Sequence, residues 1–240
     1  MLSLKKRIKR YVPRTAVSLR RRINGSLLRG RDPMEGYGRE VFFYKAFKAL
    51  SYNGISGDYL EFGCDGGNTF QYAYHESRRF RMTSKLWAFD SFAGLPPQAG
   101  QEDEHPAWIA GAMATKVDEF HELCRSNRIP RSDYEVVPGY YDESLAAFAE
   151  DQAPNDIALA YIDCDLYSST MAVLEFLSPR MKHGMVMAFD DYFCWSGTNI
   201  AGERRAMLEF INGGKWNLLP FVQYSWGGMS FIVEDAELLG

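Results

Sequence analysis

The sequence predicts an α/β fold with a mostly parallel, doubly wound sheet and an antiparallel hairpin at its C-terminal edge. Five short apolar runs, each of strand length, recur from residue 58 onward. The mixed segments between them are long enough for crossover helices. Two further apolar runs near the C-terminus are separated only by QYSWGG, which indicates a hairpin. The chain has 240 residues, 46% of them hydrophobic, which is enough for the core of one such domain.

The predicted elements follow one another in a regular order. Residues 32–57, with the run REVFFYKAFKALSY, predict a helical segment that leads into the sheet. Each of the five strands is nearly continuously apolar, as is typical of a strand buried on both faces of a parallel sheet. These strands are expected at 58–63, 85–90, 134–139, 157–163 and 185–190. The crossover helices are expected at about 68–82, 108–128, 142–151 and 166–182. The C-terminal part is expected to form a helix near 201–213 and the two hairpin strands, 216–222 and 229–235.

Charge sets the N-terminus apart from the rest of the chain. Of the 27 basic residues, 11 precede the first acidic residue, Asp32, and the remainder carries a net charge of −15. No long apolar region follows, so this is not a secretory signal. One interpretation of this basic segment is an arm that binds anionic lipid, nucleic acid or the acidic surface of a partner subunit, as in a homo-oligomer. The other interpretation is a solvated tail. We divide the chain into residues 1–57, a basic N-terminal arm with the helical segment, and residues 58–240, the α/β domain.

Cysteine content and hydropathy bound the cellular context. The four cysteines are far apart and form neither a CxxC motif nor a Cys/His cluster, so a zinc site and a disulfide framework are not expected. A reducing cytoplasm is therefore the expected compartment. No stretch of about 18 apolar residues is present, so no membrane span is expected. The acidic domain offers no surface for phosphates, which argues against nucleic acid as a partner.

A glycine-rich turn and a following acid predict a nucleoside cofactor. The first strand ends in LEFGCDGGNTF (60–70), where glycines allow a tight turn and close approach to a ligand. The second strand ends in FDSF, which places Asp90 and Ser91 at its tip, and an acid at about this distance commonly binds ribose hydroxyls. The dinucleotide pattern G-x-G-x-x-G is missing. This favours a cofactor without a diphosphate, such as S-adenosylmethionine, over a purely structural turn.

Four acids at the ends of two predicted neighbouring strands indicate a hard divalent cation. YIDCDLYSST (161–170) supplies Asp163 and Asp165, and MVMAFDDYF (185–193) supplies Asp190 and Asp191. Ligands of open α/β sheets bind at the carboxyl ends of the strands, where these acids would converge. Mg²⁺ prefers such oxygen ligands. The alternative is that one of the first pair only caps the following helix.

Together, LEFGCDGG, WAFDSFAGLP, PGYYDESL, YIDCDLYSST and FDDYF resemble the macrocin and mycinamicin O-methyltransferase family, of the TylF type. The resemblance covers about residues 58–200. It implies a Rossmann-like class I methyltransferase fold for the α/β domain and Mg²⁺-dependent transfer of a methyl group from S-adenosylmethionine to a hydroxyl of a sugar or glycosylated metabolite. The basic N-terminus departs from the family pattern, so nothing is carried over to it.

The resemblance also implies roles for individual residues. Glu61 and Gly63 would shape the methionine end of the cofactor site, Asp90 and Ser91 would hold the ribose, and Asp163, Asp190 and Asp191 would bind Mg²⁺. We assign five further positions to the cofactor site: Gly67, Asn68, Thr69, Gly139 and Tyr140. Asp163 is assigned to the cofactor site as well as to the metal.

The resemblance also makes Asp165 the candidate general base, if it lies within hydrogen-bond reach of an acceptor hydroxyl. His105, in the predicted lid Gly94–Trp108, is a weaker alternative, because a lone histidine is more often structural. A second lid is expected at Trp195–Gly202.

Other functions fit parts of the pattern. A haloacid-dehalogenase-like Mg²⁺ phosphatase also uses D-x-D after a strand, but it would place this motif near the start of the chain and leave EFGCDGG unused. A glycosyltransferase with a DxD metal site is a further alternative. A non-catalytic scaffold or interaction protein that binds S-adenosylmethionine belongs to a different class, and retention of the whole acid set argues against it. The acceptor itself is not defined by the sequence.

Overall fold

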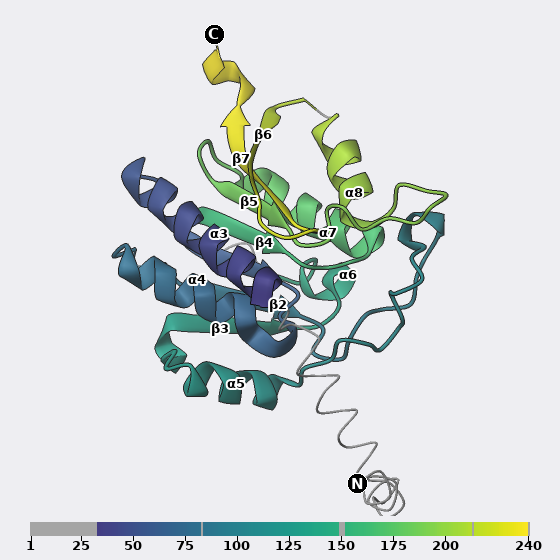
Figure 1. The fold of residues 1–240 in the computed structure, drawn as a ribbon, viewed down its shortest axis with the longest axis horizontal. Helices are drawn as coiled ribbons and strands as arrows, with labels where there is room; N and C mark the ends of the chain where they lie inside the picture. Colours follow the sequence, from purple (N-terminus) through teal and green to yellow (C-terminus); the bar gives the residue numbers. More distant parts are fainter. Residues whose placement is uncertain (1–32, 83, 149–151, 213, 240) are drawn as a thin grey trace, which may run out of the picture. The chain divides into compact units, whose positions relative to one another are not determined.

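Figure 1 shows the computed structural model, which describes residues 33–82, 84–148, 152–212 and 214–239. The chain divides into two units between Tyr37 and Gly38, and the second unit, Gly38–Gly240, holds the sheet. The basic residues 5–31 lie outside the described part, so the predictions about the arm stay predictions. The helical segment is confirmed as α3 (Pro33–Tyr52), and from Gly38 onward it belongs to the same unit as the sheet.

A seven-stranded sheet has the order β3-β2-β1-β4-β5-β7-β6. The first five strands pair in parallel, and β7 pairs antiparallel with both β5 and β6. Both the parallel sheet and the C-terminal hairpin are therefore confirmed. The strands are β1 (Asp58–Phe62), β2 (Leu86–Asp90), β3 (Tyr134–Pro138), β4 (Ile157–Ile162), β5 (Val186–Phe189), β6 (Trp216–Gln223) and β7 (Met229–Asp235).

Helices cover both faces of the sheet. The longer ones after α3 are α4 (Asn68–Arg79), α5 (Val117–Ser126), α7 (Tyr167–Leu177) and α8 (Gly202–Ile211), and α6 (Tyr141–Ser144) is a single turn. The short 3₁₀ turns are η1 (Asp65–Gly67), η2 (Gln101–Asp103), η3 (Arg131–Asp133), η4 (Ser178–Arg180) and η5 (Ala236–Leu239). One core cluster joins α3, α4 and α5 to the sheet, and the other joins α6, α7 and α8 to its opposite face (Figure 1).

Alternation along each strand sorts side chains between these two clusters. In β1, Tyr59 belongs to the cluster under α3, whereas Leu60 and Phe62 belong to the cluster under α7. All three are fully buried, as expected of a strand that is covered on both faces. From α3, Phe43 packs on Tyr59 and Tyr161, with ring centroids 6.0 and 5.4 Å apart.

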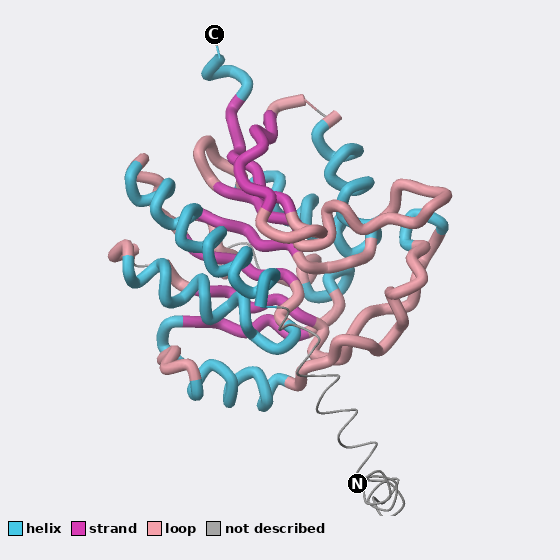
Figure 2. Tube along the Cα trace, viewed as in Figure 1, coloured by secondary structure: helices cyan, strands magenta, loops and turns pink. Residues whose placement is uncertain are grey.

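Two helices are shorter than the sequence suggested. The segment expected at 108–128 becomes helical only at Val117, because Gly111 and Met113 have positive φ angles of 75° and 56°, which a right-handed helix does not accept. In the segment expected at 142–151, only the turn α6 is helical among the described residues. The extra loop lies at the edge where the parallel strands end, and Figure 2 shows the long loops that gather there.

All four cysteines lie in the described part of the chain. All four cysteines are buried and free. Within the described ranges, no helix combines the length and the apolar character that crossing a membrane requires.

Candidate functional site

The carboxyl ends of β1 and β4 touch at Gly63. Its φ of +92° lies in the region that favours glycine, and a Cβ at this position would lie 1.9 Å from the carbonyl oxygen of Asp163. The two chain segments are therefore too close for any side chain at position 63. Gly66 and Gly67 follow in left-handed conformations, and the Gly66 amide donates to the Thr115 hydroxyl at 3.0 Å. The turn before α4 is thus fixed by the loop that precedes α5.

Glu61 lies beneath this turn and is fully buried. The hydroxyl of Thr69, in the first turn of α4, donates to its Oε1 at 2.7 Å, and the hydroxyl of Tyr59 donates to its Oε2. Burial is the main cause that raises the pKa of Glu61 to about 8. Both oxygens have partners within the protein, so Glu61 is placed to hold α4 against β1 under the predicted cofactor site. Asn68 begins α4 directly above.

Asp90 ends β2 with its carboxylate directed at the same turn. Its two oxygens accept the backbone amides of Cys64 and Phe92, both at 2.6 Å. A carboxylate has about four acceptor positions, so each oxygen keeps one for a ligand. Burial raises the pKa of Asp90, and these two hydrogen bonds oppose the shift. Ser91 donates to the carbonyl of Gly94 at 2.8 Å and so closes the turn that follows.

The end of β3 meets the end of β2 at Gly139. Its amide donates to the Asp90 carbonyl at 2.9 Å, and its φ is +131°. Tyr140 precedes α6 and is 37% exposed, so its ring is accessible at this edge. The residues assigned to the cofactor from sequence thus all lie at the carboxyl ends of β1 to β4 or in the turns that follow.

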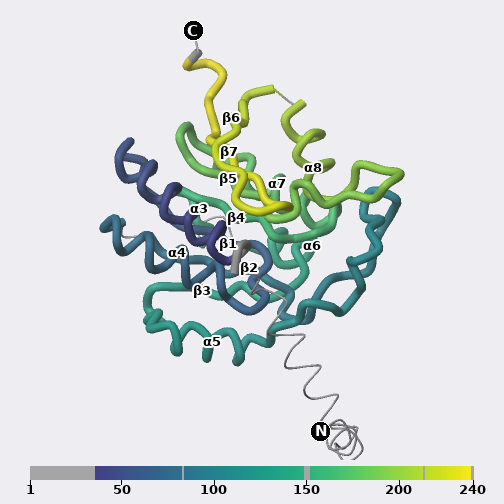
Figure 3. The backbone as a smooth tube through the Cα atoms, in the orientation of Figure 1, coloured from purple at the N-terminus to yellow at the C-terminus, as the bar shows by residue number. Residues whose placement is uncertain are grey.

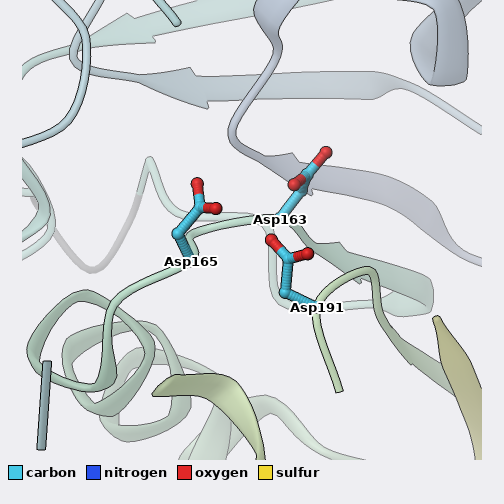
Figure 4. Close-up of side chains that lie close together, drawn as sticks. All are labelled: Asp163, Asp165 and Asp191. Carbon is cyan, nitrogen blue, oxygen red and sulfur yellow. The ribbon is translucent and has the colours of Figure 1, made fainter. Parts of the chain in front are cut away.

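Three carboxylates gather beyond β4 and β5, as Figure 4 shows. Asp163, Asp165 and Asp191 each offer an oxygen atom, and these atoms lie within 4.8 Å of one another. We call these three residues the acid trio. Burial is the first cause that raises the pKa of each of them, and nearby carboxylates raise it further. Without a cation, the site therefore favours retained protons over full charge.

Asp190, predicted as a ligand, lies outside the trio. Its carboxylate accepts Nε of Arg39 on α3 at 3.0 Å and also accepts Nη2 of the same guanidinium. The hydroxyl of Tyr161 is a further donor. The structure thus brings together Asp163 and Asp191 as the sequence suggested, but with Asp165 in the place of Asp190. The predicted division between metal ligands and a separate base stays a prediction.

Glu203 is a residue that the sequence reasoning missed. It lies in the first turn of α8 and is fully buried. Its Oε1 accepts the Cys164 amide and its Oε2 accepts the Asp191 amide, both at 2.9 Å. One signal was present in the sequence, since this acid is followed by apolar residues at helical spacing, Ala206 and Met207, which are also buried.

The two predicted lids contact each other. Asn199 donates to the Gln101 carbonyl at 2.8 Å, so the segments around residues 101 and 199 lie side by side, as Figure 3 also shows. Asp103 accepts the amide and the hydroxyl of Ser168, both at 2.9 Å, which anchors the first lid to the start of α7. Trp108 is 5% exposed and packs against Gly202.

The predicted histidine alternative lies within the first lid. The ring of His105 is 4.4 Å from that of Trp108, and its Nδ1 accepts the Ala107 amide at 3.2 Å. These local contacts account for its position. The other side chain named as a base is Asp165, which is 7% exposed and lies in the acid trio.

The donor set of the acid trio fits a hard divalent cation. Carboxylate oxygens are the ligands that Mg²⁺ and Ca²⁺ prefer. One oxygen from each member of the trio lies within 4.8 Å of the other two, which is near enough for one cation to be shared among them. The turn after β1 likewise fits a nucleoside cofactor, since a Cβ at Gly66 would meet only the Asn68 side chain within 4 Å.

Sequence comparisons give a family and one curated relative. The family model described as Macrocin-O-methyltransferase (TylF) matches residues 8–211. An 8-demethyl-8-(2,3-dimethoxy-alpha-L-rhamnosyl)-tetracenomycin-C 4'-O-methyltransferase from Streptomyces olivaceus is 26% identical over an alignment of 151 residues that covers 58% of this chain. The match spans about half of that relative's length, 54%.

Solved structures of methyltransferases share the fold. The calicheamicin methyltransferase CalS11 superposes with a TM-score of 0.70 at 19% identity, over 95% of this chain and 90% of its own. The O-methyltransferase NovP gives 0.65 at 20% identity, over 81% and 79%. An O-methyltransferase from Bacillus cereus in complex with SAH gives 0.53 at 13% identity, over 80% of each chain. At these identities the likeness shows the fold, which is the Rossmann-like methyltransferase fold.

Proposed function

Because the chain belongs to the macrocin O-methyltransferase (TylF) family, we propose that it transfers a methyl group from S-adenosylmethionine to a hydroxyl of a sugar or glycosylated metabolite, with Mg²⁺ bound at the acid trio. The observation that carries the proposal is the juxtaposition of the trio with the glycine turn, joined where Gly63 meets the Asp163 carbonyl. Membership of a methyltransferase family argues against the phosphatase and glycosyltransferase alternatives.

The cofactor half of the proposal rests on the turns after β1 and β2. The turn at Gly66 leaves the backbone open to a ligand, and Asp90 keeps acceptor positions for ribose hydroxyls. Glu61 and Thr69 would act from below, by holding the first turn of α4 in place. The structural neighbour with bound SAH is a methyltransferase of the same fold, which supports this choice of cofactor.

The metal half of the proposal rests on the chemistry of the acid trio. Three carboxylates so close together, one of them buried and two half-buried, repel one another unless a cation or protons compensate them. A bound Mg²⁺ would supply positive charge that orients an acceptor hydroxyl and lowers its pKa. Asp163, Asp165 and Asp191 would hold it, and Asp190 would remain the partner of Arg39.

Within this arrangement the chain's own residues orient the reactants and receive a proton. Asp165 is placed to accept the proton of the acceptor hydroxyl, since it lies in the acid trio at the proposed cation site. The lids, tied together by Asn199 and anchored by Asp103, would exclude water. The sulfonium supplies an activated methyl group, so the protein contributes mainly orientation.

The acceptor class follows from the curated relative. That protein is named as a methyltransferase of a rhamnosyl tetracenomycin, so we propose a deoxysugar, free or attached to a metabolite. Trp195 and Trp226 are 41% and 68% exposed, and aromatic side chains of this kind can stack on sugar rings.

An assay with isotope-labelled S-adenosylmethionine and a panel of rhamnosides tests the proposal. We expect transfer of the label with Mg²⁺, loss of transfer with EDTA, and recovery when Mg²⁺ is added in excess. Full turnover in EDTA would contradict the metal half. Absence of S-adenosylmethionine binding in calorimetry would contradict the whole proposal, whereas cofactor binding without transfer to any acceptor would favour a scaffold.

The variant Asp165→Asn separates the two roles that its position allows. If Asp165 is only the base, turnover falls while Mg²⁺ affinity is kept; if it is a ligand, both fall. Asp118→Asn is the matched control, because Asp118 is exposed in the first turn of α5. Normal turnover of Asp165→Asn would exclude both roles.

A further inference from the structure

We infer that Glu203 is a positioning residue that sets the spacing of the acid trio. This inference rests on the proposed cation site and deepens it. Glu203 touches neither the proposed substrate nor the cation in our account; it acts through the backbone of the two loops that carry the trio.

The geometry is that of a clamp between two loops. Cys164 lies between Asp163 and Asp165, and its amide donates to one oxygen of Glu203 at 2.9 Å. The amide of Asp191 donates to the other oxygen, also at 2.9 Å. One carboxylate therefore ties the loop after β4 to the loop after β5. Since all three members of the trio belong to these loops, their mutual distances depend on this link.

The start of α8 is shaped to bring Glu203 to this position. Gly202 has a φ of +61°, and a Cβ there would lie 2.6 Å from the Asp165 carbonyl oxygen and 2.4 Å from the Trp108 ring. A residue with a side chain would push α8 away from the loop. The first turn of a helix also favours a negative charge, because its free amides give this end a positive potential.

The choice of a carboxyl side chain here follows from its two oxygens. A single carbonyl or hydroxyl oxygen would leave one of the two amides without this link, whereas the buried Glu203 accepts both. Cation affinity in oxygen sites rises with the rigidity of the site, and the link through Glu203 contributes to that rigidity.

Two substitutions separate the clamp from the charge. Glu203→Gln keeps the volume but has only one acceptor oxygen, so one of the two amides loses its partner and a charge is removed. Glu203→Asp keeps the charge but is shorter by one methylene group and cannot reach both amides. Loss of a group that orients metal ligands typically weakens metal binding 10- to 100-fold. We expect losses of about that size in both variants.

The experiment is a titration of the full-length protein with Mg²⁺ by calorimetry and with Mn²⁺ by electron paramagnetic resonance. Glu209→Gln is the matched control, since Glu209 lies on the same helix and bonds to the side chains of Arg205 and Tyr167. We expect its cation affinity to equal that of the wild type. S-adenosylmethionine affinity and the melting temperature, measured on every variant, show that the rest of the site is intact.

The outcomes separate this inference from the proposed function. Weaker cation binding in both Glu203 variants, with unchanged cofactor affinity, supports the clamp. If the wild type binds the cation and both variants bind it equally well, the inference is wrong and the proposed function stands. An effect in Glu203→Gln alone would leave only the charge and overturn the clamp. If the wild type binds neither Mg²⁺ nor Mn²⁺, the proposed cation site fails and the inference with it.

Discussion

Replacing Gly63 with alanine tests the contact that joins the two halves of the site. The new Cβ would lie 1.9 Å from the Asp163 carbonyl oxygen and 2.9 Å from its carbonyl carbon, both backbone atoms that cannot rotate away. An ordinary contact needs well over 3 Å, so β1 and β4 must separate by more than 1 Å at their ends. Asp163 would move with its backbone and leave the acid trio.

Two terms set the expected loss of stability. The φ of +92° costs an alanine about 1–2 kcal/mol, and forced overpacking costs about 1–3 kcal/mol more. Gly54 separates these terms, because its φ is +70° but a Cβ there would meet nothing within 4 Å. Gly54→Ala should therefore show the conformational cost alone, and Gly63→Ala should exceed it by about 2 kcal/mol.

Urea unfolding of both variants measures the difference, and a Mg²⁺ titration of each measures its effect on the site. We expect Gly63→Ala to bind the cation more weakly and Gly54→Ala to bind it normally. If the two variants had equal unfolding free energies and equal cation affinities, the tight contact between β1 and β4 would not exist in solution.

Two further predictions concern buried charges. Arg39→Met should lower the unfolding free energy by about 3 kcal/mol, because it leaves Asp190 buried without its cation. Arg125→Met removes an ion pair whose two side chains are both exposed, so it should cost less than about 1 kcal/mol; equal losses in urea unfolding would contradict this. Glu61 keeps its proton up to about pH 8 in the folded protein but releases it near 4.5 when unfolded, so the wild-type unfolding free energy should fall between these pH values relative to that of Glu61→Gln. Parallel pH profiles of the two proteins would show that the pKa of Glu61 is not raised.

Much of the fold could be predicted because its signals are local. Continuous apolar runs marked the five parallel strands within a residue or two of their observed ends, and the QYSWGG turn marked the hairpin. The same logic predicted that the acids would converge, since parallel strands end at one edge of the sheet. Helix lengths were predicted less well. Positive φ angles at Gly111 and Met113 keep residues 108–116 out of the predicted helix, and a methionine gives no strong sequence signal for a positive φ.

The membership of the acid trio could not be predicted for a different reason. Asp190 and Asp191 are adjacent in sequence, and only the partner of Asp190 distinguishes them. That partner, Arg39, lies 151 residues away on α3, and pairing over such a distance leaves no local pattern. Glu203 was missed likewise, since its two bonds go to backbone amides, which carry no sequence information.

A crystal structure of the protein grown with Mn²⁺ and S-adenosylhomocysteine tests the central claim most directly. Mn²⁺ takes the same oxygen ligands as Mg²⁺ and can be located by its anomalous scattering. We predict one peak within about 2.2 Å of carboxylate oxygens of Asp163, Asp165 and Asp191, with Asp190 still paired to Arg39 and the ribose of the cofactor at Asp90. A peak bound by Asp190, or no peak between these loops, would contradict the account.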